Sequence, residues 1–216
     1  ASSGSTAALV IGIFGVMAIT SEYTTSAVQS SLTVNPRRGM FYATKSVATA
    51  LFALVAGIVG ILLAAGVLWL FTRGHDITAL TSDQSRIIPV TLIGFPLTIV
   101  LVSLMAQGLG GMTRSTVGGV CALIVLFMVL SSVLSITSMA INQVEWLGTL
   151  SYLTPDTAMN HFLGAGIESS SQSTLAAAVK PNYWIPDWWQ SGLILLAWAA
   201  AAWAGGLIVT KKADIK

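Results

Sequence analysis

Long apolar stretches with almost no charge are the feature that most restricts how this chain can fold. The longest runs from about Phe41 to Phe71 and contains one charged residue, Lys45. A membrane-spanning helix needs about 20 consecutive apolar residues. Only 8% of the 216 residues are charged, whereas a soluble domain carries about 25%. The sequence therefore predicts an integral membrane protein.

Apolar stretches recur along the chain, and they lack the strict alternation that the strands of a membrane β-barrel would show. We expect an all-α, polytopic fold that forms a single transmembrane domain over residues 1–216. The five predicted spans are about 6–20, 41–71, 87–109, 116–141 and 189–209.

Individual spans have features of their own. The first is short for a full crossing, and the second is long enough to be tilted. The third holds Pro89 and Pro96, which allow a kink. We expect a tight connection over Gly110-Gly111-Met112-Thr113-Arg114 before the fourth span.

The distribution of lysine and arginine predicts the orientation, because these residues are retained on the cytoplasmic side. Placing the polar loop 21–45 inside and alternating the spans puts seven basic residues inside and three outside. The C-terminus is then cytoplasmic and Ala1 is external, and one further span before Ala1 would account for that external start. The inside set is Arg37, Arg38, Lys45, Arg114, Lys211, Lys212 and Lys216.

The polar loop between the first two predicted spans has the signals of a short helix. Ser21 resembles an N-cap, and Glu22 is an acid suited to the positive end of a helix. No Gly or Pro follows until Asn35-Pro36, where helical geometry is disfavoured. We expect a helix over about 22–34 that lies at the membrane surface, where its hydroxyl-rich face could dock on a protein or on lipid.

The predicted external segment 142–188 repeats apolar residues at helical spacing, and the sequence from Tyr152 to Asp156 indicates a helix end and a restart. Aromatic residues then gather where the last span begins. We interpret them as an interfacial belt, and the alternative is that they line a substrate path. They are Tyr183, Trp184, Trp188 and Trp189.

Motifs for catalysis and nucleotide binding are missing. The chain contains no GxxxxGK[ST], GxSxG or HExxH sequence, so we expect no catalytic residue, metal or cofactor on the chain itself. The predicted spans hold almost no ionisable residue, which argues against a proton-coupled transporter or an intramembrane protease. The single Cys121 excludes an intrachain disulfide.

Small residues spaced four apart occur within the spans and allow close approach of helices, for which packing inside one subunit is the simpler use. These pairs are Ala8 and Gly12, Ala53 and Gly57, Ala56 and Gly60, Gly118 and Ala122, and Ala201 and Gly205.

Hydroxyl, amide and methionine side chains also occur inside the predicted membrane spans. Serines in membrane helices mostly bond their own backbone; the alternative is a weakly polar path for an amphiphilic substrate. The candidate path residues are Ser103, Met105, Gln107, Met128, Ser131, Ser132 and Ser135.

Three pieces of the polar loop carry a family resemblance: SEYTTSAVQSSL at 21–32, VNPRR at 34–38 and ATK at 43–45. They resemble the signature of ABC-2-type transporter permeases, in the form common in actinobacteria. The turn at 110–116 and the external segment 152–158 are also similar to family elements. Ser26 and Gln29 depart from the pattern, which usually has a glycine and a basic residue there.

The resemblance implies six membrane helices, the first of which is missing here, and two permease subunits, identical or different, with two ABC ATPase subunits. ATP and Mg²⁺ would bind the partner ATPase, which would dock on the loop helix as a coupling helix. The coupling residues implied are Glu22, Tyr23, Thr24, Thr25, Val28, Leu32, Arg37 and Arg38.

We therefore expect the permease subunit of an ATP-driven exporter in the bacterial plasma (inner) membrane. Its substrate would be a hydrophobic or amphiphilic compound such as a drug, antibiotic, peptide or lipid, and no nucleic-acid partner is expected. The alternative is a scaffold or sensor subunit that recruits a cytoplasmic partner without transporting anything. A channel or secondary transporter is disfavoured because charged intramembrane groups are lacking.

Overall fold

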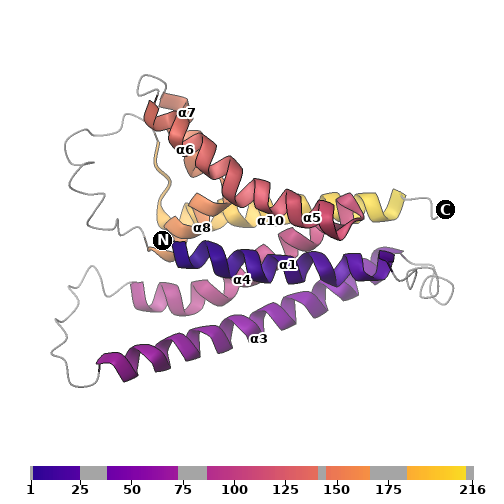
Figure 1. Ribbon diagram of the computed structural model, residues 1–216, viewed down its shortest axis with the longest axis horizontal. Coiled ribbons are helices and arrows are strands. Elements are labelled where there is room, and N and C mark those ends of the chain that lie inside the picture. The colour runs from indigo at the N-terminus through magenta and orange to yellow at the C-terminus, as the bar shows by residue number, and fades with distance from the viewer. Residues whose placement is uncertain (1, 25–37, 73–86, 141–144, 166–183, 213–216) are drawn as a thin grey trace.

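The computed structural model describes residues 2–24, 38–72, 87–140, 145–165 and 184–212. Helix is the only regular structure in these ranges, which confirms the predicted all-α class. The long helices run side by side in an elongated bundle (Figure 1). The elements are α1 (Ser2–Thr24), α3 (Arg38–Thr72), α4 (Ile87–Thr113), α5 (Thr116–Ile124), η2 (Val125–Val129), α6 (Leu130–Ala140), α7 (Glu145–Tyr152), α8 (Pro155–Leu163) and α10 (Trp188–Lys212).

Four helical segments are long and apolar enough to cross a membrane, and they match the second to fifth predicted spans. The first predicted span lies in α1, whose apolar part is Thr6–Ser21. A helix of that length rises about 24 Å, less than the roughly 30 Å of a hydrocarbon core. The candidate spans are Gly39–Thr72, Ile88–Thr113, Thr116–Thr137 and Trp188–Lys212.

The connection after the third span is shorter than the sequence predicts. α4 continues through Gly110 and Gly111 to Thr113, so the expected tight turn from Gly110 onward is wrong. Arg114, with φ of 51°, reverses the chain, and the Ser115 hydroxyl accepts a hydrogen bond from the Gly118 amide at the start of α5. The glycines stay helical because they serve helix packing rather than a turn.

The fourth span is one continuous helical rod with a π-helical turn, η2, between α5 and α6. Leu130 donates its amide to the carbonyl of Val125, five residues earlier, in place of the usual four. After the span, α7 ends at Tyr152 and α8 starts at Pro155. This confirms the predicted helix end and restart, since proline suits the first turn of a helix.

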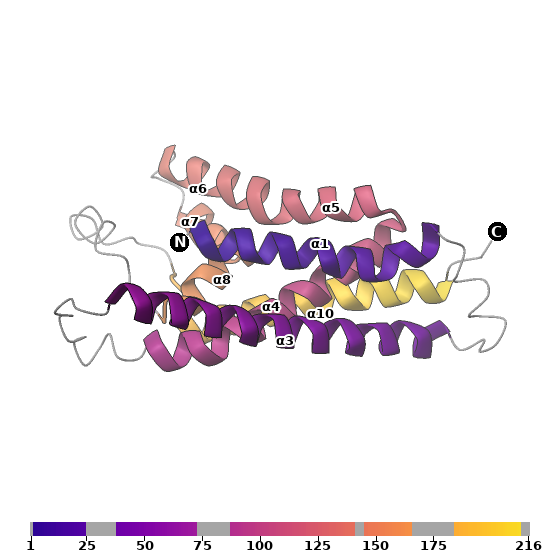
Figure 2. The same cartoon turned by 60° about the horizontal axis from the view of Figure 1, so that its bottom comes forward.

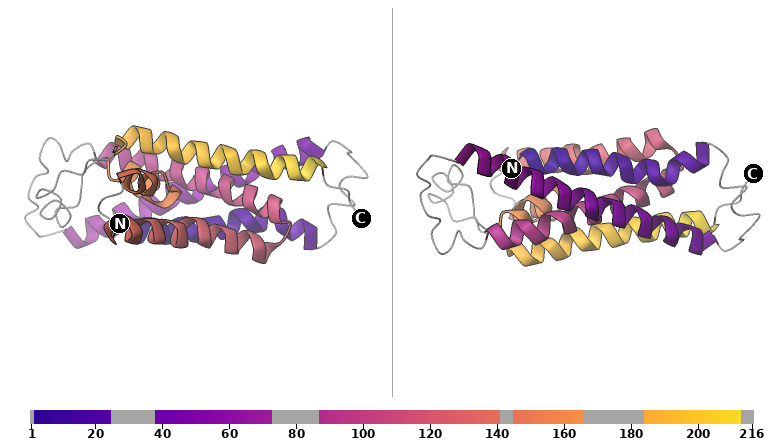
Figure 3. Two further views of the ribbon diagram at one scale, coloured as in Figure 1. Left: turned by 90° about the horizontal axis from the view of Figure 1, so that it is seen from above. Right: turned by 90° about the horizontal axis from the view of Figure 1, so that it is seen from below.

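α4 is the central helix, because it has extensive contacts with α1, α3 and α10 and also contacts α5 and α8. Figure 2 turns the bundle by 60°, and Figure 3 shows it from the two opposite sides. Small residues bring the neighbouring helices to the backbone of α4. Gly15 of α1 lies against the Ser103 carbonyl, and a Cβ on Gly57 of α3 would lie 2.8 Å from Cα of Pro96. These contacts leave no room for side chains at the glycine positions.

The small-residue pairs predicted from the sequence are partly confirmed. Ala8 and Gly12 are buried, as are Ala53 and Gly57, and all four pack inside this chain. In two other pairs, Gly118 with Ala122 and Ala201 with Gly205, the buried residues are the ones that directly follow the predicted ones. Gly119 rather than Gly118 meets Gly110 of α4. Ala202 and Gly206, rather than Ala201 and Gly205, lie on α10 against Gly108.

Candidate functional site

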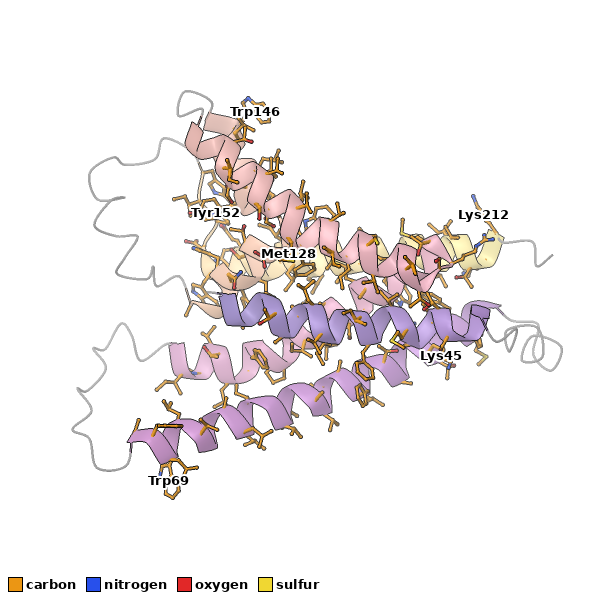
Figure 4. The ribbon with its side chains drawn as sticks, viewed as in Figure 1. Lys45, Trp69, Met128, Trp146, Tyr152 and Lys212 are labelled. Atoms are coloured by element: carbon orange, nitrogen blue, oxygen red, sulfur yellow. The ribbon has the colours of Figure 1, made fainter. Side chains whose placement is uncertain are left out.

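The two ends of the bundle differ in charge. Among the described side chains, those of the lysines and of Arg114 lie at one end, and the aspartates Asp156 and Asp187 lie at the other. Two contacts tie the basic end together: Thr116 of α5 donates to the Thr20 hydroxyl of α1 at 2.8 Å, and Gly39 of α3 lies beside Lys211 of α10. Figure 4 shows Lys45 and Lys212 at this end and Trp69, Trp146 and Tyr152 at the opposite end. We call it the basic end; its described basic side chains are Lys45, Arg114, Lys211 and Lys212.

The predicted start of a new helix at Ser21 is wrong. α1 runs without interruption to Thr24, so Glu22, Tyr23 and Thr24 belong to its last turn. The hydroxyl of nearby Thr20 donates to the carbonyl of Val16 at 2.9 Å, which is a bond inside a helix and not a cap. Arg38 is the first residue of α3. The other proposed coupling residues, Thr25, Val28, Leu32 and Arg37, and most of the predicted helix 22–34, lie outside the described residues.

α1 ends and α3 begins at the basic end (Figure 1). The segment 25–37 therefore connects the two helices at that end. This is also the end at which α10 finishes with Lys211 and Lys212, and at which Arg114 joins α4 to α5.

The candidate path residues fall into separate places. Ser103, Met105 and Gln107 are buried on α4. Ser131 on α6 is buried and donates to the Thr154 hydroxyl at 3.1 Å. The remaining three, Met128, Ser132 and Ser135, are exposed on the span that contains η2. These residues do not converge on one surface within a single chain.

The serines satisfy their hydroxyls in two ways. Ser103 donates to the carbonyl of Val100 in its own helix at 2.8 Å, as predicted for membrane serines. Ser131 instead reaches Thr154, the residue just before α8. The second bond ties the fourth span to the segment between α7 and α8.

Two buried polar side chains of α4 lack a hydrogen-bond partner. They are Thr98, through its hydroxyl, and Gln107, through both atoms of its amide. Gln107 is 0% exposed. Leaving a buried polar group unpaired costs about 1–3 kcal/mol. Gln107 thus lowers the stability of this conformation, and a group that supplied hydrogen bonds to it would be favoured.

The face of α4 that carries Gln107 is covered by three helices. Residues four apart lie on one face of a helix. Ser103, one turn earlier, lies against Gly15 of α1 and lines a groove between α1 and α3. Gly111, one turn later, lies beside Gly206 of α10 and the Tyr42 ring of α3. Gln107 therefore lies on the face of α4 that packs against α1, α3 and α10.

A groove of about 460 Å³ separates α1 from α3, and we call it the α1–α3 groove. The two helices share few direct contacts, because each packs mainly on α4. The rings of Phe14 and Phe52 meet across the groove with centroids 5.6 Å apart. The lining residues are Ile11, Phe14, Gly15, Met17, Ala18 and Ser21 of α1; Lys45, Ala48, Thr49, Phe52 and Ala53 of α3; and Ser103 of α4.

Two further grooves differ from this one in chemistry. One of about 400 Å³ lies between α3, α4 and α10, and Ser46 and Trp203 are among its lining residues. Another of about 440 Å³ lies between the fourth span, α4 and α10, and Trp198 is among its lining residues. Neither has a charged residue in its lining, whereas Lys45 lines the α1–α3 groove.

Sequence reasoning missed a polar network between α3 and α10. The Tyr42 hydroxyl donates to the Trp203 carbonyl at 3.3 Å, and the Trp203 indole donates to the Ser46 hydroxyl at 2.7 Å. Tyr42 and Ser46 are four residues apart and therefore share a helix face. That spacing is the sequence signal, but it names no partner on α10.

The aromatic residues at the opposite end have mixed surroundings. Trp184 and Trp189 are about half exposed, which agrees with the interfacial interpretation. Trp188 instead stacks on Phe162 of α8, with centroids 6.2 Å apart. Farther along α10, the Trp198 indole donates to the Leu153 carbonyl at 2.8 Å. Part of this group therefore holds the α7–α8 region against the bundle.

The chain matches no protein-family model, and no curated protein or solved structure is significantly similar to it.

Proposed function

We propose that the chain is the permease subunit of an ATP-binding cassette exporter, as its resemblance to ABC-2-type permeases implies. One observation supports the proposal most. The segment that resembles the coupling helix joins α1 to α3 at the basic end of the bundle. Basic residues are retained on the cytoplasmic side of a membrane, so a cytoplasmic ATPase could reach this segment.

The membrane arrangement follows from the same reasoning. The basic end faces the cytoplasm of a bacterial plasma membrane, which makes the C-terminus cytoplasmic. α1 counts as the fifth visible span, and it crosses the bilayer with help from its polar ends, because the 23 residues from Ser2 to Thr24 rise about 35 Å. A second permease subunit and the ATPase subunits, which bind ATP and Mg²⁺, complete the transporter.

The proposed mechanism depends on the direct connection of residues 22–38 to α1 and α3. Closure of the ATPase subunits presses on residues 22–38, and the force passes directly into α1 and α3. Both helices rest on α4 and have few contacts with each other, so their separation is free to change. The permease then alternates between two packings of its helices, and makes no covalent bond.

An amphiphilic substrate fits the polar groups on α4. Gln107 and Thr98 are buried without a partner, and a substrate or water that entered between the helices would satisfy them. This favours a cargo that is apolar overall and carries hydrogen-bonding groups.

A non-transporting scaffold or sensor subunit is the alternative. The observation that favours it is the separation of Ser103, Met105 and Gln107 from Met128, Ser132 and Ser135. A scaffold needs no path, and it would use the same 22–38 segment to recruit a cytoplasmic partner.

Purification of the full-length protein in mild detergent tests the proposal. A soluble subunit with a Walker motif should co-purify in stoichiometric amount, and ATP hydrolysis should be stimulated by transported compounds. Glu22→Ala should abolish this stimulation and transport, whereas Asp187→Ala at the opposite end should leave both unchanged. A preparation that binds a cytoplasmic partner without ATPase activity would support the scaffold instead.

A further inference from the structure

We propose that the α1–α3 groove holds an anionic phospholipid, with its phosphate beside Lys45 and one acyl chain along the apolar lining. This inference concerns occupancy of the groove and does not rest on the proposed transport function.

The lining of the groove changes from polar to apolar along its length. Lys45 and Ser21 lie toward the basic end, where α3 begins and α1 ends. Phe14 and Phe52 lie farther into the bundle, about two helical turns away. A cation with hydroxyls at one end and an aromatic and aliphatic channel at the other is complementary to an anionic amphiphile.

The depth of Lys45 matches the level of lipid phosphates. α3 has 35 residues and rises about 52 Å, which exceeds the 40–45 Å of a whole bilayer including headgroups. Its first turns at Arg38 therefore reach into or beyond the headgroups. Lys45 lies about 10 Å farther along and precedes the apolar run from Val47. It is therefore placed near the boundary between headgroups and hydrocarbon.

The charge selects the class of lipid. Basic pockets between membrane helices on the cytoplasmic side are known sites for anionic headgroups. The α1–α3 groove has the basic residue Lys45 in its lining, whereas the grooves lined by Trp203 and by Trp198 have no charged residue in theirs. Those two grooves suit any acyl chain, but the α1–α3 groove prefers a lipid with a negative headgroup.

The α1–α3 groove is large enough to hold one acyl chain of a phospholipid. Its volume of about 460 Å³ is within the range of roughly 300–1,000 Å³ found for small-ligand sites. The floor is narrow, because Gly15 lies directly against the Ser103 backbone. A single extended chain between α1 and α3 suits this shape better than a bulky ring system.

Lipid retention by the purified full-length protein tests the proposal. The protein is exchanged into detergent with equal amounts of phosphatidylglycerol and phosphatidylcholine, and bound lipid is measured by native mass spectrometry. Wild-type protein should retain phosphatidylglycerol preferentially. Lys45→Gln should reduce that retention about fivefold, the effect of one lysine near a membrane surface. Lys211→Gln, at the same end but outside the groove, should have little effect.

A second pair of variants tests where the acyl chain lies. Ala48→Phe fills the α1–α3 groove and should displace the lipid although Lys45 remains. Val47, the neighbouring residue on α3, lines the separate groove between α3, α4 and α10, so Val47→Phe should leave phosphatidylglycerol bound. Circular dichroism and the elution volume in size-exclusion chromatography show whether each variant is folded. If Ala48→Phe does not fold, the smaller substitution Ala48→Leu takes its place.

Four outcomes would overturn the proposal. Equal losses in Lys45→Gln and Lys211→Gln would indicate general attraction of anionic lipid to the basic end. Equal phosphatidylglycerol retention by Ala48→Phe and Val47→Phe would show that the lipid does not bind in the α1–α3 groove. Displacement of the lipid by excess inorganic phosphate would assign Lys45 to a free-anion site. Conversion of a dimer to a monomer by Ala48→Phe, with lipid retention unchanged, would make the groove an interface between copies.

Discussion

The Trp203 indole nitrogen lies 2.7 Å from the Ser46 hydroxyl oxygen and donates a hydrogen bond to it. Trp203 is on α10 and Ser46 on α3, two helices that make far fewer contacts with each other than each makes with α4. Ser46 in turn donates to the Tyr42 carbonyl at 2.9 Å. The bond therefore joins two neighbours of α4 through side chains near the basic end.

Replacing Trp203 by Phe should destabilise the protein by about 0.5–1.5 kcal/mol, because the ring is kept while the donor to Ser46 is lost. Trp189→Phe is the matched control, since Trp189 is on the same helix and half exposed. Equilibrium unfolding in detergent with increasing SDS measures both. Equal stability of the two variants would show that the hydrogen bond contributes nothing net.

Replacing Gly206 by Ala should destabilise the packing of α10 on α4 by about 1–3 kcal/mol. An added Cβ would lie 2.7 Å from the Gly108 carbonyl oxygen, which belongs to the backbone and cannot rotate away. Gly66→Ala is the control, because no atom lies within 4 Å of its Cβ position. That variant should be neutral or slightly stabilising. The temperatures at which the Gly206→Ala and Gly66→Ala proteins aggregate in detergent measure the difference in stability.

Replacing Gln107 by Leu should raise stability by about 1 kcal/mol or more, because it removes two buried polar atoms that have no partner. If Gln107 lies on the substrate path, transport by this stabilised variant should fall. Unfolding and efflux measured on the same variant separate the two effects. A destabilised Gln107→Leu protein would mean that the amide is satisfied, for example by water.

Cysteine labelling should reveal the orientation of the bundle. In a Cys121→Ser background, Asp187→Cys should react with a membrane-impermeant maleimide added to intact cells. Lys212→Cys, at the basic end, should react only after the cells are permeabilised. Both native side chains are exposed, so access does not depend on unfolding. The reverse labelling pattern would invert the orientation and would remove the support for a cytoplasmic coupling segment.

The membrane helices could largely be predicted from the sequence, because the apolar stretches exceed the length needed for crossing. Their ends were harder to place. Gly110 and Gly111 favour a turn by composition, yet they remain in α4, because glycine in membrane helices also permits close packing. Ser21 resembled a helix N-cap because serine is favoured there. A hydroxyl inside a helix can instead donate to the carbonyl one turn earlier, as Thr20 does to Val16, so a serine or threonine need not mark the start of a helix.

The site depends on information that the sequence does not contain. Lys45 and Phe14 line one groove only because α1 and α3 both rest on α4. The register of α10 was also ambiguous, since Ala201 with Gly205 and Ala202 with Gly206 have the same spacing. The second pair makes the contact, because the orientation of a helix is decided by all the side chains on its face.

The π-helical turn in the fourth span lets a single rod serve two different partners. Before it, Gly119 and Leu123 face α4 and α1; after it, Ser131 faces Thr154 beside α8. A π-turn contains one residue more than the α-helical path, and one residue corresponds to about 100° of rotation. Winding all five residues of Val125–Val129 as regular α-helix would therefore swing α6 by roughly a quarter turn and direct Ser131 away from Thr154, whereas deleting one of them would restore an α-helix along the same path and keep Ser131 beside Thr154. The span thus uses one surplus residue as an angular adjustment between the two halves of the bundle.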